Sequence, residues 1–299
     1  MTVEELLRGL NETLRNLVAY HLMGIIPIHI EGQPQLLMQG LGKDDTLTAL
    51  RESIRIRSNS IVYHLNRIDS IDNQYNTAIQ KFGSKPEGIG WKEWSGKLME
   101  ENGILQSYYA DDVIFHIVSL FDYIGRMIVY ILQGDVNRKA NWKDAVKYAR
   151  DPGSKANKKG YRIDASLVAK CLIKHEQEFL QKLADFRADI YHREMYFPKV
   201  SSTMSSQNFS RNKIEVKSSE ELFKWMKRSI DNVGNRSSEY LLLKDALRIL
   251  VEEAFRRAID VLHSLWGDVN QKNQQETPFQ IGEVQKRKNT NNDRKNNAK

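Results

Sequence analysis

The chain has 299 residues, one cysteine, 40% hydrophobic residues and a formal net charge of +7. This length is enough for one or two domains with a large core, and the single cysteine, Cys171, excludes an internal disulfide and a Cys-rich zinc site. One cysteine fits a reducing cytoplasm, and the N-terminus, with Glu4 and Glu5 early, has no apolar run typical of a signal peptide.

Helical periodicity dominates the first part of the chain, and strand patterns are scarce. A first amphipathic helix is predicted at residues 2–22. Residues 45–82 predict a very long helix, whose apolar residues follow heptad spacing that Arg57 and His64 interrupt. Residues 83–97 contain four glycines, a proline and two tryptophans, and they predict a turn region.

An apolar central helix is predicted at residues 104–133, and residues 113–132 within it are long enough to span a bilayer. This stretch contains Asp122 and Arg126. In a membrane each would cost about 2.5–3.5 kcal/mol. The two residues are also i,i+4 partners, which suits a helix with one wet edge. We therefore expect a core helix and no membrane contact.

Basic residues gather in the next part of the chain. Residues 143–162 hold seven basic and two acidic residues, and a short basic helix is predicted at 139–150. The loop after this helix contains Lys155, Lys158 and Lys159. Such a patch attracts phosphates, so we expect these lysines to contact nucleic acid, with a solvated loop as the alternative.

Further helices complete the pattern. A helix is predicted from 165 to about 197, where Pro198 stops it, with Val168, Leu172, Phe179, Leu183, Phe186 and Ile190 as its core stripe. Residues 199–217 predict an irregular loop or a short hairpin, and Ser218 with Glu221 has the spacing of a capping box. The last long helix is predicted from 238 to about 267. Residues 269–299 form a basic, Asn-rich tail of the kind that is disordered. Together these elements predict an all-α bundle.

Two nucleotide- or metal-binding patterns fail on inspection. The stretch "GIGWKEWSGK" has five residues between Gly90 and Gly96, and Leu98 stands where a phosphate loop needs Ser or Thr. The stretch "HEQEF" at His175 lacks the second histidine of a zinc-protease helix. We therefore expect no metal and no other cofactor.

One stretch carries a candidate active site, "QKLADFRADIYHREMYFP" at residues 181–198. Arg187 and His192 in it fit the pattern of an arginine, four to six residues and a histidine. Three other pairs fit the same pattern: Arg15/His21, Arg57/His64 and Arg257/His263. Only Arg187/His192 follows a plausible central helix, "YYADDVIFHIVSLFDYIGRMIVYILQG", so we take it as the predicted site.

This combination resembles the HEPN superfamily over roughly residues 104–266. The resemblance implies an all-α, HEPN-like bundle at residues 101–268, with 1–100 as an N-terminal helical extension. It also implies metal-independent RNA cleavage in the cytoplasm, in defence or toxin–antitoxin biology. RNA would then be a partner, and an antitoxin or regulatory protein a further one.

In that reaction the 2′-OH attacks the adjacent phosphate. His192 would act as general base or acid, Arg187 would stabilise the phosphate charge, and Asp189 would orient the imidazole. Arg187 and His192 diverge by about 140° on a straight helix. The resemblance implies that facing motifs of a homodimer form the site. The alternative is a non-catalytic helical interaction module with the same fold, in which Asp189 pairs with Arg193.

Overall fold

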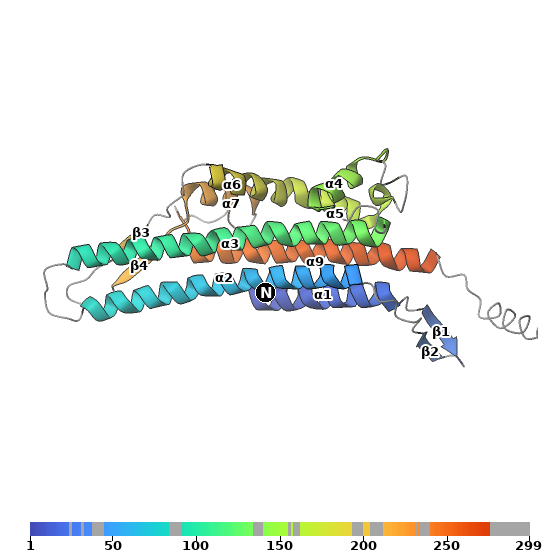
Figure 1. Ribbon diagram of the computed structural model, residues 1–299, viewed down its shortest axis with the longest axis horizontal. Coiled ribbons are helices and arrows are strands. Elements are labelled where there is room, and N and C mark those ends of the chain that lie inside the picture. The colour runs from blue at the N-terminus through green and yellow to red at the C-terminus, as the bar shows by residue number, and fades with distance from the viewer. Residues whose placement is uncertain are drawn as a thin grey trace, which may run out of the picture.

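The computed structural model describes residues 1–23, 26–30, 33–37, 45–83, 91–133, 140–154, 157, 162–192, 200–203, 212–230, 233 and 240–275. Side chains at the edges of some of these segments, including those of residues 20–23 and 189–192, lie outside the description. In this part of the chain, long helices run side by side along the molecule (Figure 1). The predicted all-α bundle is therefore confirmed.

The framework consists of the four longest described helices, α1 (Val3–Met23), α2 (Asp45–Gly83), α3 (Trp91–Gln133) and α9 (Leu243–Gln275). α2 packs against α3 along much of its length, and α1 packs against both α2 and α9. α3 closes the ring because it also contacts α9. Helices that pack side by side in this way each need one apolar face toward their neighbours, and the helical periodicity of the apolar residues in the sequence supplies it.

The core lies between these helices. Six of the seven predicted heptad positions of α2 are buried, with exposed fractions between 0% and 4% for Leu47, Leu50, Ile54, Ile61, Ile68 and Ile71, and the seventh, Tyr75, is half-buried. One cluster of buried side chains joins residues of α1 and α2 to residues of α3 and α9. Position 100, the boundary suggested by the resemblance, falls within α3.

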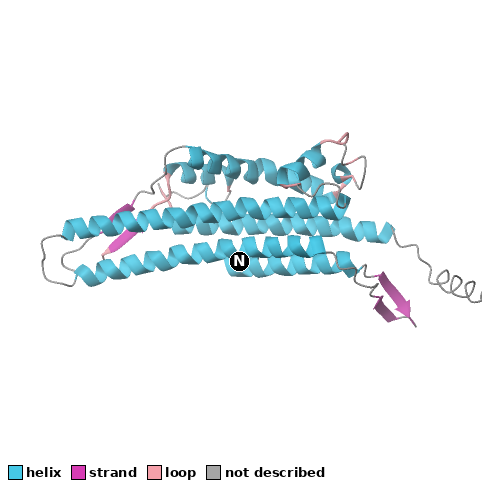
Figure 2. Ribbon diagram, viewed as in Figure 1, coloured by secondary structure: helices cyan, strands magenta, loops and turns pink. Residues whose placement is uncertain are grey.

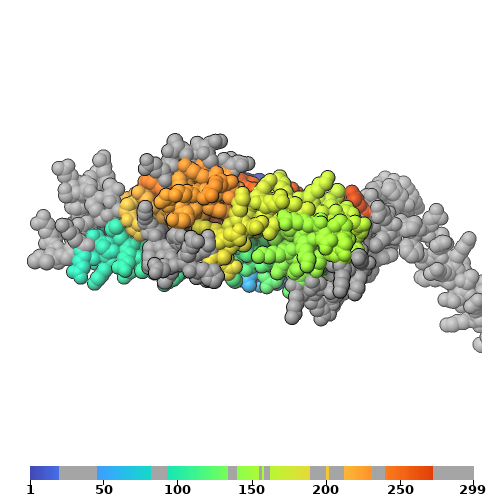
Figure 3. All heavy atoms as spheres, turned by 90° about the horizontal axis from the view of Figure 1, so that it is seen from above, coloured from blue at the N-terminus to red at the C-terminus, as the bar shows by residue number. Residues whose placement is uncertain are grey.

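A second layer of shorter helices covers one side of the bundle (Figures 1 and 3). It contains α4 (Trp142–Arg150), α5 (Leu167–His175), a π-helical turn (Glu176–Leu180), α6 (Gln181–His192) and α7 (Glu220–Ser229). A 3₁₀ turn at Ile163–Ala165 precedes α5. α4 lies very close to α3, because a Cβ added at Gly125 would come within 2.5 Å of the Trp142 Cα atom.

Helix termini in this layer have identifiable caps. Asn141 and Asp144 form a capping box at the start of α4. The carboxylate of Asp268, on α9, accepts hydrogen bonds from the backbone N–H groups of Leu167 and Val168 at 2.6 and 2.9 Å. It thereby satisfies two of the N–H groups that a helix leaves unpaired at its start.

Two short antiparallel hairpins accompany the helices (Figure 2). β1 (Ile26–Ile30) pairs with β2 (Gln33–Leu37), and β3 (Val200–Thr203) pairs with β4 (Lys213–Val216). The second hairpin confirms one of the two predictions for residues 199–217. The first was not predicted.

Several predicted boundaries were wrong, among them those of the last helix, which runs from Leu243 to Gln275 and not from 238 to about 267, so its end lies within the predicted tail. α3 begins at Trp91, so both tryptophans of the predicted turn region belong to a helix. The helix predicted from 165 to 197 is divided, because the π-helical turn inserts between α5 and α6. The cap of α7 is Ser219, whose side chain accepts from the Leu222 N–H at 3.1 Å, one residue later than predicted.

Within the described residues, α3 is the one helix long and apolar enough to cross a membrane. Its most apolar window has a mean hydropathy of 1.5, and 56% of that window is buried inside the molecule. Val113, Ile117, Leu120 and Ile124 are each 0% exposed. This burial matches the expected core helix.

Candidate active site between two long helices

Two histidines from different helices meet where α2 packs on α3. The rings of His64 (α2) and His116 (α3) are stacked, with centroids 5.3 Å apart and planes 20° from parallel. The His64 side chain is 17% exposed. His116 is likewise half-buried, so both rings are within reach of solvent, as acid–base groups in an active site must be.

Arg57 holds one of these rings. Its Nη1 atom lies 3.1 Å from Nδ1 of His116, and its guanidinium carbon lies 5.6 Å from the centre of the Phe115 ring. A guanidinium can only donate hydrogen bonds, so Nδ1 of His116 must accept. In the neutral ring the proton is then on Nε2, which makes that nitrogen the donor offered to a ligand.

Asp112 lies next to the other ring. Its Oδ2 atom is 3.5 Å from Nδ1 of His64. This distance is long for a hydrogen bond, although catalytic hydrogen bonds often tighten when substrate binds. A proton on Nδ1 would face the carboxylate and leave Nε2 of His64 as the acceptor. We refer to Arg57, His64, Asp112 and His116 as the His64–His116 cluster, which thus offers one acceptor nitrogen and one donor nitrogen.

The surroundings keep His116 neutral. Burial lowers the pKa of His116 most, and the positive charge of Arg57 and the proximity of His64 lower it further. The negative charge of Asp112 acts in the opposite direction. Because the pKa lies below its ordinary value near 6.5, His116 remains unprotonated at neutral pH and keeps its bond from Arg57.

Arg187, the arginine predicted from sequence, reaches the same part of α3. Its guanidinium carbon lies 4.7 Å from the centre of the Phe115 ring, the ring that Arg57 also contacts. The positive charge of Arg187 also lowers the pKa of Asp122, which burial raises overall. α6 therefore adds a second guanidinium close to the His64–His116 cluster.

The other predicted site residues lie outside the described side chains. The backbone of α6 is described as far as His192, but the side chains of Asp189 and His192 are not. Lys155, Lys158 and Lys159 also lie outside the described residues, as does the side chain of His21. Their roles stay predictions.

The remaining Arg–His match separates in the fold. Arg257 Nη1 lies 3.0 Å from Nδ1 of His175, whereas His263 Nε2 lies 3.2 Å from the hydroxyl of Thr13. The two side chains of this pair thus have different neighbours. By contrast, Arg57 and His64 are seven residues apart, so their side chains leave α2 in directions that differ by only about 20° and lie on one face of the helix.

Sequence reasoning missed His116 and set aside Arg57 and His64. Available signals were the interruption of the α2 heptad pattern at these two positions and the histidine within the most apolar helix. Each signal alone is common in soluble helices. Their meaning depends on the register between α2 and α3, which places His116 opposite His64.

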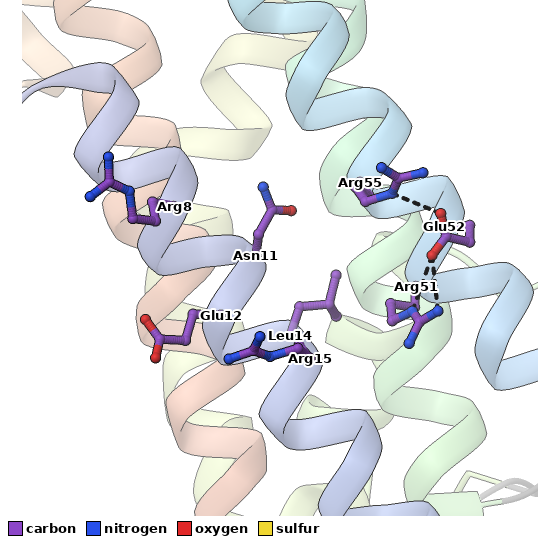
Figure 4. A pocket seen from close by; sticks show the side chains of 8 residues that line it. All are labelled: Arg8, Asn11, Glu12, Leu14, Arg15, Arg51, Glu52 and Arg55. Atoms are coloured by element: carbon purple, nitrogen blue, oxygen red, sulfur yellow. Dashed lines mark hydrogen bonds and ion pairs between the residues drawn. The ribbon is translucent and has the colours of Figure 1, made fainter.

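A second feature is a groove between α1 and α2 with a volume of about 490 Å³ (Figure 4). Arg8 and Arg15 approach it from α1, and Arg51 and Arg55 from α2. Its other lining residues are Asn11, Glu12, Leu14 and Glu52. We refer to it as the arginine groove.

Ion pairs within the arginine groove leave it positively charged. Glu52 pairs with both Arg51 and Arg55, at 3.0 and 2.7 Å. Four guanidinium groups face two carboxylates, so the lining carries a net charge of +2. This surface favours an anionic ligand such as a phosphodiester backbone.

The chain matches no known family in the comparisons made: a scan against protein-family models, a search of curated proteins and a search of solved structures each found no match.

Proposed function

We propose that this protein is a metal-independent endoribonuclease of HEPN type. The observation that carries the proposal is the stacked pair of His64 and His116, with Arg57 bonded to one ring and Asp112 beside the other. Two imidazoles and a guanidinium supply proton transfer and phosphate stabilisation without a metal ion.

In the proposed reaction, Nε2 of His64 removes the proton from a ribose 2′-OH, and Asp112 stabilises the imidazolium that forms. The 2′-oxygen then bonds to the adjacent phosphorus, and the bond from phosphorus to the 5′-oxygen breaks. His116 donates its Nε2–H to a phosphate oxygen, while Arg57 offsets the negative charge of the pentavalent phosphorus. The products are a 2′,3′-cyclic phosphate and a 5′-hydroxyl.

α6 contributes the residues predicted from the Arg–His pattern. Arg187, above Phe115, is the second phosphate-stabilising guanidinium. His192, further along the same helix, is proposed to protonate the leaving 5′-oxygen, with Asp189 orienting its ring. This assignment retains the predicted pair and adds the His64–His116 cluster to it.

RNA is the proposed partner, and the arginine groove is the proposed surface for its backbone. Arginine forks bind phosphate oxygens in pairs, which suits the four guanidinium groups that line the arginine groove. The lysines at 155, 158 and 159 are proposed as further phosphate contacts. Replacing Arg8 and Arg15 with Gln should lower the salt dependence of RNA binding, and an unchanged dependence would exclude the groove.

We further propose a cytoplasmic homodimer acting in defence or toxin–antitoxin biology, with an antitoxin or regulatory protein as a second partner. Ile56 and Tyr63 of α2 are 56% and 58% exposed and are seven residues apart on one helix face. A second copy could cover this apolar face. Light scattering that finds only monomers, with and without RNA, would contradict the dimer.

The decisive experiment is RNA cleavage in the presence of EDTA. Wild-type protein should produce 2′,3′-cyclic phosphate ends, and His64→Gln should not. Products with a 5′-phosphate would exclude the reaction, because that end requires an external nucleophile. If no RNA is cleaved and the protein binds another protein specifically, the alternative of a non-catalytic helical interaction module is favoured. The exposed apolar face of α2 also suits that alternative.

A further inference from the structure

A second polar cluster joins α5 to α9, on helices that take no part in the proposed cleavage. Cys171 and His175 stand one turn apart on α5, and Asp260 faces them from α9. The Asp260 Oδ2 atom lies 3.3 Å from the Cys171 sulfur and 2.8 Å from Nε2 of His175. We propose that these three residues bind a divalent transition-metal ion of the zinc type.

The donor atoms suit such an ion. One donor atom from each residue, a sulfur, an imidazole nitrogen and a carboxylate oxygen, all lie within 4.8 Å of one another. Around tetrahedral zinc, donors at about 2.0–2.3 Å from the metal are separated by about 3.3–3.5 Å. The sulfur and oxygen already have about this separation, the nitrogen and oxygen need to part by about half an ångström, and the sulfur and nitrogen, which lie within 4.8 Å of each other, must also reach it.

The fold fixes two of the ligands and leaves the third accessible. His175 is only 4% exposed in its side chain, whereas Asp260 is 56% exposed, so an ion can reach the cluster from the solvent side. The π-helical turn Glu176–Leu180 begins directly after His175. Turns of this kind recur at functional sites. Three protein ligands would leave a fourth position for water.

The proton balance can be stated for each group. In the metal-free cluster the thiol of Cys171 and the Nε2–H of His175 both donate to Asp260, because Arg257 donates to Nδ1 of His175 at 3.0 Å. Metal binding releases the thiol proton and moves the imidazole proton from Nε2 to Nδ1. Arg257 must then leave Nδ1.

Arg257 has other partners that allow this movement. Its Nε atom lies 2.7 Å from Glu253, and its Nη1 atom lies 3.1 Å from Glu178. Glu178 pairs with the same Nη1 atom that bonds Nδ1 of His175, so it is the proposed acceptor for the relocated Nδ1–H, as a carboxylate often is for a metal-bound histidine. Arg257→Gln removes the competing donor, so this variant should bind metal at least as tightly as the wild type.

The experiment is a Co²⁺ titration of the full-length, metal-free protein. We expect one Co²⁺ per chain and a thiolate-to-cobalt absorption band that Zn²⁺ abolishes by displacement. Since Cys171 is the sole cysteine of the chain, Cys171→Ser must remove the band. Asp260→Asn should weaken binding by about 100-fold or more, beyond the 10–100-fold typical of outer-shell changes.

The exposed position of Asp260 makes its variant the safest test, because Asp260→Asn changes no buried packing. Circular dichroism would confirm that it folds. Binding of Co²⁺ without a thiolate band, or equal binding by wild type and Asp260→Asn, would overturn the site. RNA cleavage is measured separately, so this result does not depend on the proposed ribonuclease function.

Discussion

Replacement of His64 by Gln separates catalysis from stability most clearly. His64 is the proposed general base, and loss of such a group lowers the rate by about 10²–10⁴-fold, or about 2.7–5.4 kcal/mol of barrier. The structural loss is measured separately. The ring contacts the rings of His116, Tyr63 and Tyr109, and contacts of this type contribute about 0.5–1.5 kcal/mol each, or about 1.5–4.5 kcal/mol for the three.

That loss converts into a change in melting temperature. For 299 residues the unfolding entropy is about 0.6 kcal/mol per kelvin, so His64→Gln should lower Tm by about 2.5–7 °C. His263→Gln is the control, because it also replaces a histidine on a long helix and costs about 0.5–1.5 kcal/mol through its bond to Thr13, yet lies outside the site. Single-turnover cleavage of a labelled RNA by both variants and by His192→Ala completes the assay. Full activity of His64→Gln with none in His192→Ala would refute the His64 assignment and place the base on α6.

Three further predictions concern single residues. Arg57→Gln should raise the pKa of His116 toward its ordinary value, because it removes a neighbouring positive charge, and an NMR titration that shows no rise would contradict the contact. Because the folded-state pKa of His116 is lowered, the wild type should lose stability as pH falls below about 6.5, and Arg57→Gln should reduce the His116 part of that loss. Asp268→Ala should lower the free energy of unfolding, measured with urea, by about 2–4 kcal/mol, because two N–H groups at the start of α5 lose a charged acceptor. A decrease of less than about 0.5 kcal/mol would exclude the cap. Gly125→Ala should lower the free energy of unfolding by about 1–3 kcal/mol, because the added Cβ would meet the Trp142 backbone at 2.5 Å. An unchanged free energy of unfolding would show that α4 is free to shift.

Hydrophobic periodicity predicted the bundle because the long helices bury one stripe each. The apolar positions of α2, such as Leu47, Ile54 and Ile61, are spaced so that any packed partner must cover them. Periodicity gave no warning of the division between α5 and α6. The core stripe of Val168, Leu172 and Phe179 keeps helical spacing in the sequence across the π-helical turn, and all three residues are buried, so the apolar pattern has no break at that point.

The candidate site was harder to predict, because its residues come from three helices. Arg187 was predicted, and it lies over Phe115. Phe115 precedes His116 directly on α3, but nothing in the sequence of α6 indicates that Arg187 packs against this part of α3. The contact between His116 and Arg57 spans 59 residues of sequence and depends on the register of α2 against α3. A spacing pattern within one helix contains no information on that register, so it could not choose among four matches.

The polar side chains of the His64–His116 cluster occupy a helix–helix contact where apolar residues would normally pack, and this gives a final prediction. Replacement of a buried ion pair or triad by well-packed apolar residues of similar volume is often neutral or stabilises by about 1–4 kcal/mol, and we expect the same of this cluster. The variant with Arg57→Leu, His64→Leu and His116→Leu should therefore unfold at equal or higher denaturant concentration than the wild type, yet fail to cleave RNA. Residues retained at a cost to stability are those expected at an active site. If the triple variant is instead less stable by several kcal/mol, the cluster serves to hold α2 on α3, and the catalytic groups must be sought on α6.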